Sequence, residues 1–437
     1  MKPYPEYKDS GVEWIGEIPV GWETRRLASL GLFSKGNGIK KDEVKPTGSP
    51  CIRYGEIYTK YNRVFYNPIS FIDEETSLNC ISIQKGDVLF AGSGESEEEI
   101  GKTLVYYGEN DIFAGGDIII LKLIQGLNPL FISYLMVSNG VNHQKSRNAK
   151  GGIIVHIYPK QLREIQVSIP PFPEQTKIAN FLDTKTQQID KLIQNKEQKI
   201  KLLQEKRTAV INQAVTKGLT PDVEMKDSGV EWIGQIPKGW GLSKLKYCIS
   251  IRGGQVNPQE PEQLEKILIA PNHIQSKTGV LLYTETAKEQ GAKSGKHLFE
   301  TEDVLYSKIR PKLRKVCIAQ GDGLCSADMY PIKTDRNFMI PQFLLYTLLG
   351  EKFSQYTEER SLRVAMPKVN REDVENYIIA LPSVNEQISI CEYITSNNNK
   401  FDDLISKEQR KIELMKEYRK SLISDAVTGK IDVREAV

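Results

Sequence analysis

Residues 7–22 read YKDSGVEWIGEIPVGW, and residues 225–240 read MKDSGVEWIGQIPKGW. Thirteen of these sixteen positions are identical, at an offset of 218 residues. A second matching pair follows in the same order at an offset of 212: IPPFPEQ at 169–175 and LPSVNEQ at 381–387. A period above about 200 residues is too long for a solenoid, so the sequence indicates two copies of one module.

Each copy has the same order of features: a tryptophan-rich entry, a body rich in short strands, the Glu-Gln segment and a long helix. Strand signals occur at 87–91 and at 117–123, each followed by a glycine-containing turn. Residues 128–139 and 341–350 are typical of short buried helices. We therefore predict an α+β fold: two mixed α/β bodies in internal repeat, separated by two long helices that pair as an antiparallel coiled coil.

The long helices are predicted from the segments after each Glu-Gln. No proline or glycine occurs from Glu174 to Lys217, and Gly218 supplies a stop. Apolar residues recur at alternating steps of four and three, which is typical of a coiled coil. The predicted seam is Leu182, Ile189, Ile193, Lys196, Ile200, Leu203 and Val210 in the first helix, and Ile394, Phe401, Ile405, Glu408, Ile412, Met415 and Leu422 in the second.

The midpoint of each predicted helix carries a charged residue. Under twofold antiparallel pairing, Lys196 and its counterpart Glu408 fall near the axis, where we expect them to face each other and set the register. The predicted organisation is a first body at 1–173, a helix at 174–217, a linker at 218–224, a second body at 225–385, a helix at 386–429 and a tail at 430–437.

Composition excludes several classes of protein. The 437 residues carry 59 Lys plus Arg against 56 Asp plus Glu, so any nucleic-acid surface must be local. No stretch approaches about 18 consecutive apolar residues, so no membrane span is predicted. The segment MKPYPEYKDSG lacks an apolar signal core, and the six cysteines form no C-x-x-C pair. We therefore expect a cytoplasmic protein with reduced thiols.

Three motifs resemble catalytic ones but lack required residues. Ile169-Pro-Pro-Phe172 has isoleucine where an adenine methyltransferase needs a polar acceptor for the base. Gly101-Lys-Thr103 lacks the first glycine of a phosphate loop, and the acidic residues of 221–224 are too close in sequence to converge on Mg²⁺. The four histidines have no metal-ligand spacing. We predict no catalytic residue, no metal site and no cofactor bound by this chain.

The doubled entry, the helix starts IPPFPEQTKIANFLD and LPSVNEQISICEYI, and the strands GDVLF and EDVLY resemble the specificity (S) subunit of type I restriction–modification enzymes. The resemblance covers essentially the whole chain, in order and twice. It implies two target-recognition domains that each read one half of a split double-stranded DNA target, held apart by the helices. It also implies a non-catalytic chain that docks two methyltransferase (M) subunits and, through them, restriction (R) subunits, with S-adenosylmethionine, ATP and Mg²⁺ on the partners.

DNA contacts are predicted in local basic clusters because the total charge is near zero. The best is Ser307–Lys315, whose alternating cations would form one basic face if the segment is extended; Pro311 restricts it to an edge or loop. The alternative is a solvated edge strand with protective lysines. The full predicted set is Arg53, Tyr54, Lys60, Arg63, Lys145, Arg147, Lys150, Lys308, Arg310, Lys312, Arg314, Lys315, Arg360, Arg363 and Lys368.

Two other features bear on recognition. The acidic run Glu95–Glu99 is unfavourable beside phosphates, so we expect that loop either to avoid the DNA backbone or to accept hydrogen bonds from cytosine N4. The pairs Trp14/Trp22 and Trp232/Trp240 stand in identical context in both halves. Because readers of different half-sites should differ, we expect these tryptophans to pack in the core or to dock body on helix rather than to stack on bases.

Two alternative functions remain at the level of sequence. A single-chain nuclease or methyltransferase with built-in recognition would need a carboxylate cluster or a methyl-donor loop, and neither is visible. A coiled-coil scaffold without a DNA role would leave the basic segment at 308–315 and the two divergent bodies unexplained.

Overall fold

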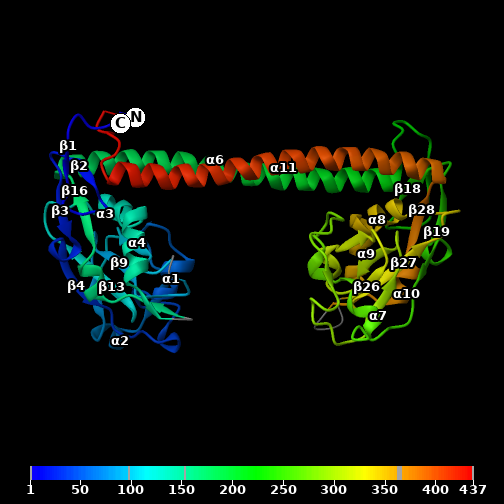
Figure 1. The fold of residues 1–437 in the computed structure, drawn as a ribbon, viewed down its shortest axis with the longest axis horizontal. Coiled ribbons are helices and arrows are strands. Elements are labelled where there is room, and N and C mark those ends of the chain that lie inside the picture. The colour runs from blue at the N-terminus through cyan, green and yellow to red at the C-terminus, as the bar shows by residue number, and fades with distance from the viewer. Residues whose placement is uncertain (1, 97–98, 152–153, 362–366, 436–437) are drawn as a thin grey trace. The chain divides into compact units, whose positions relative to one another are not determined.

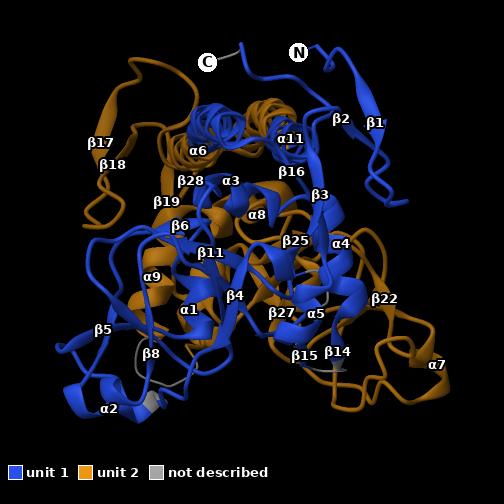
Figure 2. Cartoon of the chain, turned by 90° about the vertical axis from the view of Figure 1, so that its left-hand side faces the viewer, with its two compact units in different colours: residues 1–196, 410–437 blue, residues 197–409 orange. Residues whose placement is uncertain are grey.

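The computed structural model describes residues 2–96, 99–151, 154–361 and 367–435 (Figure 1). The chain divides into unit 1, residues 1–196 with 410–437, and unit 2, residues 197–409 (Figure 2). Each long helix contributes to both units: α6 is Phe172–Lys217 and α11 is Val384–Val427. The sequence-based organisation gave each long helix as a segment separate from the two bodies. In the structure, one part of each helix belongs to unit 1 and the other part to unit 2. No helix of the described residues could cross a membrane.

Unit 1 is built on two sheets around a buried apolar core. The predicted strands at 87–91 and 117–123 are confirmed, and all four residues of Val88–Ala91 are buried. The first sheet has the order β4 (Gly31–Lys35), β13 (Ile118–Leu123), β9 (Val88–Ala91), β11 (Thr103–Tyr106) and β6 (Val64–Phe65). The second has the order β7 (Ser70–Ile72), β5 (Ser49–Ile52), β12 (Ile112–Ala114) and β8 (Ile81–Ile83).

Unit 2 repeats this topology, apart from the edge strand β6, although its body has diverged in sequence. Its first sheet has the order β20 (Ile249–Ile251), β27 (Met329–Thr334), β24 (Val304–Ser307) and β25 (Val316–Ile318). Its second has the order β22 (Glu285–Thr286), β21 (Ile267–Ile269), β26 (Gly323–Cys325) and β23 (His297–Phe299). Both second sheets contain one parallel pair, β12 with β5 and β26 with β21, so the repeat extends to strand direction.

Short helices follow the central strands in the same order in both units. The predicted buried helices are confirmed as α3 (Pro129–Leu135) and α8 (Pro341–Leu349); Asn128 caps α3 by accepting from the backbone N–H of Leu130. The others are α4 (Asn139–Asn148), α5 (Pro159–Arg163), α9 (Glu351–Ser361) and α10 (Arg371–Glu375). A strand pair then leads into each long helix: β16 (Gln166–Ile169) with β3 (Glu23–Arg26), and β28 (Ile378–Leu381) with β19 (Gly241–Lys244).

The remaining elements are short. In unit 1 they are β1 (Tyr7–Asp9), β2 (Glu17–Pro19), α1 (Tyr54–Thr59), α2 (Glu74–Leu78), β10 (Ser93–Gly94), β14 (Lys150–Gly151) and β15 (Val155–His156), with 3-10 turns η1 (Leu27–Ser29) and η2 (Lys41–Glu43). In unit 2 they are β17 (Met225–Asp227), β18 (Gln235–Pro237) and α7 (Pro261–Leu264), with 3-10 turns η3 (Leu245–Tyr247), η4 (Pro271–His273) and η5 (Pro311–Leu313).

The repeated tryptophans clamp the ends of the long helices. Trp22 is buried and donates from Nε1 to Oε1 of Glu174 at the start of α6 (3.1 Å), and it packs near Gly429 just past the end of α11. In unit 2, Trp240 makes the same bond to Glu386 at the start of α11 (2.9 Å) and packs beside Gly218, where α6 ends. The prediction that these two tryptophans dock body on helix is confirmed.

The outer tryptophans of each pair are less buried. Trp14 is 41% exposed, and Trp232 is 37% exposed with its ring 5.9 Å from that of Tyr356. Of each tryptophan pair, therefore, only the second residue, Trp22 or Trp240, is packed in the core.

The glutamine beside each clamping glutamate explains the rest of the motif. Buried Gln175 donates to the carbonyl of Pro170 (2.9 Å) and accepts from the N–H of Asn128 (2.8 Å). Gln387 likewise donates to the carbonyl of Pro382 and accepts from the N–H of Ile340. A buried amide that satisfies buried backbone groups is costly to replace, so Glu-Gln persists in both copies.

Ion pairs join the two long helices within each unit. In unit 2, Lys199 pairs with Glu408 (2.9 Å) and Arg207 with Asp402, so positions rise along α6 as they fall along α11, and the segments run antiparallel. In unit 1, Arg419 pairs with Asp190 (2.9 Å). At the offset of 212, Asp190 corresponds to Asp402 and Arg207 corresponds to Arg419. The same Asp–Arg pair therefore occurs once in each unit.

Burial along the helices follows the predicted seam. Ile200, Leu203, Val210 and Met415 are partly buried, and Leu182, Ile189, Ile193, Ile394, Phe401, Ile405, Ile412 and Leu422 are buried. Glu408 is only 4% exposed and accepts from Lys199. The facing of Lys196 and Glu408 stays a prediction.

Candidate nucleic-acid interface

Three segments converge in unit 2 around the loop between its central strands. That loop, residues 308–315, forms backbone hydrogen bonds with residues 367–369, which follow α9. The N–H of Val369 donates to the carbonyl of Lys308, and the N–H of Arg310 donates to the carbonyl of Pro367. The third segment begins at η4, where Lys315 Nζ donates to the carbonyl of Pro271 (2.6 Å). We call residues 271–277, 308–315 and 367–369 the loop cluster of unit 2.

The same three segments converge in unit 1. The loop between its central strands, 92–102, forms β10, which pairs with β15 after α4. From α1, the hydroxyl of Tyr58 donates to the carbonyl of Glu99 (3.3 Å), and Lys102 Nζ donates back to the carbonyl of Tyr58 (3.1 Å). We call the described residues of 54–60, 92–102 and 149–157 the loop cluster of unit 1. The clusters are equivalent by topology and different in sequence.

The segment 307–315 is extended only as far as Ser307, so the condition for a single basic face is not met, and the loop that Pro311 allowed is the form it takes. Strand β24 ends there, and η5 follows, flanked by Arg310 (φ 49°) and Arg314 (φ 46°) in the left-handed region. Because side chains in a turn do not alternate, the four cations do not share one face. A left-handed residue other than glycine costs roughly 1–2 kcal/mol, and strain of this kind is concentrated at functional sites.

Four cations of the loop cluster of unit 2 remain available to an anion. Arg310, Lys312 and Lys368 are exposed, and Lys308 lies 5.1 Å from the ring centre of Tyr330. Burial, and after it the charge of Lys368, lowers the pKa of Lys308. A phosphate beside these side chains would relieve that repulsion.

Two other predicted contacts of unit 2, Arg314 and Lys315, are partly buried and turned into the protein. Arg314 donates to the carbonyl of Leu349 (3.4 Å), and Lys315 is held by Pro271. These two side chains position the loop cluster instead of presenting charge. Arg360 is exposed; its guanidinium lies 3.7 Å from the ring centre of Tyr356, its Nε lies 3.7 Å from Asp373, and its contact with DNA stays a prediction. The prediction for Arg363 lies outside the described residues.

Lys145 corrects a prediction for unit 1. Its side chain is 2% exposed, and its ammonium donates to the carbonyls of Gly101 (2.9 Å) and Met136 (3.0 Å). Burial lowers the pKa of Lys145 to about 7. Because the amine is inside the protein, it does not contact DNA; it fastens the end of the loop 92–102.

Arg63 is also a structural residue. It pairs with Asp183 on α6 (2.8 Å), donates to Ser133 (2.9 Å) and lies 3.6 Å from the ring centre of Tyr134, with its side chain 16% exposed. Arg63 therefore ties the body of unit 1 to α6, and its prediction as a DNA contact is corrected.

The remaining predicted residues of unit 1 lie at the surface in or beside its loop cluster. Tyr54, Lys60, Arg147 and Lys150 are exposed. Arg53 is partly buried and pairs with Glu56 (2.9 Å).

The central loops of the two units carry opposite charge. In unit 1, Glu95 and Glu99 are exposed where unit 2 presents Arg310 and Lys312. Residues 97 and 98 of the acidic run lie outside the described residues. Equivalent loops of opposite charge fit recognition of different partners, because a shared framework role would favour similar side chains.

Sequence reasoning missed a polar and aromatic pair in the loop cluster of unit 2 and beside it. Asn272 Nδ2 donates to the hydroxyl of Tyr283 (3.0 Å), which is 46% exposed with its ring 4.6 Å from that of His273. Neither residue belongs to a charge run or motif. Their position in the repeat could have indicated them. Asn272 follows β21 as Tyr54 follows β5, so both residues lie next to the central loop of their unit.

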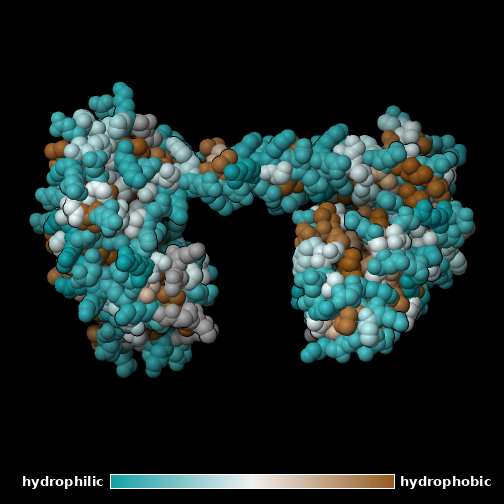
Figure 3. All heavy atoms as spheres, viewed as in Figure 1, coloured by the Kyte–Doolittle hydropathy of each residue, from teal (hydrophilic) through white to brown (hydrophobic). Residues whose placement is uncertain are grey.

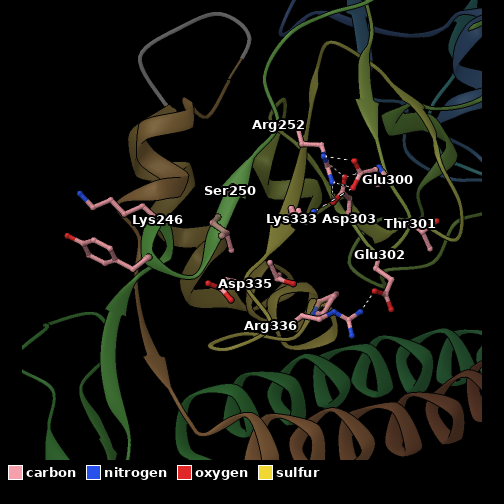
Figure 4. A pocket seen from close by; sticks show the side chains of 14 residues that line it. Lys246, Ser250, Arg252, Glu300, Thr301, Glu302, Asp303, Lys333, Asp335 and Arg336 are labelled. Carbon is pink, nitrogen blue, oxygen red and sulfur yellow. Dashed lines mark hydrogen bonds and ion pairs between the residues drawn. The ribbon is translucent and has the colours of Figure 1, made fainter.

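A polar cleft of unit 2, about 720 Å³ in volume, lies away from this cluster, and most of its charged side chains are paired with one another. Figure 4 shows Arg252 directed at Glu300 and Asp303, and Arg336 at Glu302. The hydrogen bond to Asp303 is the main cause that raises the pKa of Arg252. This network holds the turn before β24, and its paired cations do not favour phosphate binding.

No group of three or more His, Cys, Asp or Glu in the described part of the chain could hold a metal ion. The cysteines are free thiols, five of them buried, and burial raises the pKa of Cys317 to about 12, so it is an unreactive thiol.

Comparison with known proteins adds independent findings. A family model described as type I restriction modification DNA specificity domain matches residues 19–202 and 237–414. The EcoDI type I restriction enzyme specificity subunit of Escherichia coli is 26% identical over 431 residues, covering 95% of this chain and 90% of that protein. The putative MjaX specificity subunit of Methanocaldococcus jannaschii is 26% identical over 455 residues, covering 96% of each. A solved chain from work on complex assembly and conformational transition of the type I R-M system has a TM-score of 0.73 at 14% identity, covering 95% of this chain and 99% of that one, and so shares the fold.

Proposed function

Because the chain belongs to the family of type I restriction–modification specificity subunits, which recognise DNA without catalysing a reaction, we propose that it reads a split DNA target, one half by each unit. The observation that carries the proposal is the pair of loop clusters. They are built from equivalent segments on equivalent sheets, yet they present different side chains. Two readers on one framework suit a target with two unlike halves.

In the loop cluster of unit 2, one side chain contacts a base and the others contact phosphates of the DNA backbone. Arg310 is exposed beside η5, and arginine pairs bidentately with guanine O6 and N7. Lys308, Lys312 and Lys368 hold phosphates, which position the protein without reading sequence. In unit 1, Lys150, Arg147 and Lys60 take the phosphate role.

The long helices act as an antiparallel coiled-coil spacer between the two readers. The seam residues, the antiparallel ion pairs within unit 2 and the repeat of the Asp–Arg pair in unit 1 support this role. At about 1.5 Å per residue, the 46 residues of α6 extend about 69 Å. Half-sites on one face of B-DNA would lie about 34 Å apart, and packed helices keep such a separation where a flexible linker would not.

The chain assembles with catalytic subunits. We propose that its helices dock two methyltransferase subunits, which restriction subunits join, and that S-adenosylmethionine, ATP and Mg²⁺ are bound by those partners. The names of its relatives as specificity subunits of restriction enzymes support this assignment. A scaffold without a DNA role is not favoured, because the family model is a DNA specificity domain.

A binding experiment with the chain and its methyltransferase subunits tests the proposal. Arg310→Ala with Lys312→Ala is compared with wild type on DNA altered in one half-site or the other. We expect the variant to lose discrimination at one half-site only, by roughly tenfold or more, because a bidentate base contact contributes about 1–3 kcal/mol. Equal loss at both half-sites would contradict two independent readers.

Salt dependence supplies the control. Lys312→Ala alone should lower affinity on all sequences and reduce the slope of log K against log salt by about one, because a phosphate contact releases about one counterion. Lys333→Ala, on the cleft wall away from the loop cluster, should leave that slope unchanged.

A further inference from the structure

The strand registers of the two units align the ends of their central loops. In unit 1, Thr103 on β11 pairs with Phe90 on β9. In unit 2, Val316 on β25 pairs with Tyr306 on β24. Phe90 and Tyr306 end the matching segments GDVLF and EDVLY. Thr103 and Val316, the first residues after the two loops, therefore correspond to each other.

Two residues before these positions, Gly101 of unit 1 corresponds to Arg314 of unit 2. Both have a left-handed backbone, with φ of 67° and 46°. The space in front of Gly101 is taken by Lys145, because a Cβ added at Gly101 would lie 2.9 Å from Cδ of that lysine. In unit 2 the side chain of Arg314 itself starts from this point. A cationic side chain therefore lies at the end of both loops, and it comes from α4 in unit 1 and from the loop in unit 2.

The helices α4 and α9 show the reciprocal change. The offset of 212 places Thr357 at the position of Lys145, and both residues are buried, as are Val141 and its counterpart Phe353. Thr357 is uncharged, and its hydroxyl donates to the carbonyl of Phe353 (2.9 Å). Unit 2 therefore lacks a cation on α9 and has one at Arg314, whereas unit 1 has the cation on α4 and a glycine in the loop.

Both cations bind the carbonyl end of the helix that precedes α4 or α9. Lys145 Nζ donates to the carbonyl of Met136, the residue after α3 (3.0 Å), and to that of Gly101 (2.9 Å). Arg314 donates to the carbonyl of Leu349, the last residue of α8 (3.4 Å). The last carbonyls of a helix lack partners within the helix, and they favour a cation. We call Lys145 and Arg314 the anchoring cations.

The anchoring cations are directed inward, although a cation is most easily accommodated in water. The surface of each unit is mainly hydrophilic (Figure 3). Burial lowers the pKa of Arg314, and Glu351 and Glu358 of α9 act in the opposite direction, so the guanidinium lies partly buried beside α9. Because removing a charge from water costs free energy, a cation directed inward in both units, from different positions of the chain, indicates a role at the end of the loop.

That role is to hold the side chains that each loop presents. The start of each loop is set by the central sheet, since β9 ends at Ala91 and β24 at Ser307. The anchoring cation fixes the other end. Between the two ends lie exposed residues such as Glu95 in unit 1 and Arg310 in unit 2. A side chain reads a base only when it is held within about 0.5 Å of its place, which requires support from residues that do not touch the base.

We propose that Lys145 and Arg314 are positioning residues for sequence recognition, each of which holds the central loop of its own unit in the form that reads one half-site. This inference rests on the proposed function for the split target. It adds the residues that set the geometry of each reader without contacting DNA. Because the two anchoring cations occupy equivalent sites, they act in the same way and independently of each other.

Binding of the chain with its methyltransferase subunits to DNA altered in one half-site at a time tests the proposal. Discrimination is measured as the ratio of the affinities for unaltered and altered DNA. Lys145→Met keeps the length of the side chain and removes its donors, so it should reduce discrimination roughly tenfold at the half-site that Arg310→Ala with Lys312→Ala leaves intact. Arg314→Met should reduce discrimination at the other half-site. The unaffected half-site, measured in the same molecule, reports that the chain is folded.

An exchange between the units tests whether the two sites are equivalent. Gly101→Arg with Lys145→Thr gives unit 1 the pair of residues that unit 2 has. Gly101→Arg alone should reduce discrimination because the new side chain meets Lys145, and Lys145→Thr alone should reduce it because two carbonyls lose their donor. Together the two changes should restore discrimination to within about threefold of wild type, because changes at residues in contact are not additive.

Lys8→Met, at an exposed lysine of unit 1, is the matched control and should leave discrimination at both half-sites unchanged. If Lys145→Met or Arg314→Met retains wild-type discrimination at both half-sites, that residue does not position its loop, and the proposed function stands. Equal loss at both half-sites would show a general defect of the fold and would also overturn the proposal. A double variant no better than Gly101→Arg or Lys145→Thr alone would show that the sites are not equivalent. If wild type discriminates at neither half-site, the proposed function itself is wrong.

Discussion

Single residues show most clearly what sequence can and cannot predict here. The roles of Trp22 and Trp240 followed from identical context in two copies, because a residue that reads sequence should differ between readers. Lys145 and Arg63 were misplaced as DNA contacts because a basic residue in a polar segment looks exposed. Only tertiary structure turns Lys145 onto two carbonyls and Arg63 onto Asp183.

Burial of Lys145 predicts a pH dependence of stability. The folded pKa is about 7, and the ordinary value is about 10.4. Below pH 7 the amine is protonated in both states, so burial of the charge destabilises the fold. Between these values mainly the unfolded state binds the proton, so the free energy of unfolding rises with pH, by about 2 kcal/mol from pH 7 to pH 9.

Lys145→Met removes this titration. Denaturant unfolding at pH 7, 8 and 9 should give wild type a steeper rise in the free energy of unfolding than the variant, whatever the variant's absolute stability. Lys60→Met, at an exposed lysine of the same unit, is the control and should keep the wild-type slope. Parallel slopes for wild type and Lys145→Met would contradict the buried amine.

At the level of elements, the spacing of apolar residues predicted the long helices. The helix expected at 174–217 spans Phe172–Lys217, because a seam without proline or glycine leaves few alternatives. For the segment 307–315 the sequence left an edge strand and a loop both open, because alternation of basic and apolar residues does not itself specify a strand. Pro311 and two left-handed arginines turn the chain after Ser307. Turns of this kind depend on packing against neighbouring loops, which the sequence does not reveal.

The Asp–Arg pairs offer a test of helix pairing. Arg207 is buried and Asp402 exposed, so Arg207→Asp should lower the free energy of unfolding by roughly 1–2 kcal/mol, mainly through like-charge repulsion beside the seam. Adding Asp402→Arg should restore about half of that loss or more. The single reversal at Arg419 and its exchange with Asp190 should change the free energy of unfolding in the same way. Denaturant midpoints of the single and double variants measure the change at both pairs. Equal stability of the single and double variants would show that the pairs do not couple.

For the whole molecule, the repeat predicted two modules, and the shared topology of the units confirms them. The near-neutral total charge concealed how that charge is distributed. The central loop of unit 2 is basic, and its counterpart in unit 1 is acidic, so the two loop clusters differ in chemistry on equivalent sheets. Recognition of particular bases depends on contacts in the grooves of DNA, and a periodic pattern in a sequence carries no information about such contacts.

The spacer role predicts a measurable change in the DNA target. Inserting one heptad in register into both α6 and α11 adds about 10.5 Å of helix and should lengthen the spacer between half-sites by about three base pairs. Seven residues inserted into the linker after Thr220 should leave the spacer unchanged. Methylation of DNA libraries with randomised spacers measures both variants. An unchanged spacer after the helix insertions would argue against a rigid ruler.

The central claim is that each unit reads its own half of one split target. Genome-wide methylation profiling of cells that carry the chain and its methyltransferase subunits tests it most directly. We expect wild type to modify one motif with two defined halves around an undefined spacer. The Arg310→Ala, Lys312→Ala variant should relax one half and leave the other half and the spacer unchanged. A single continuous motif, or relaxation of both halves together, would contradict the account.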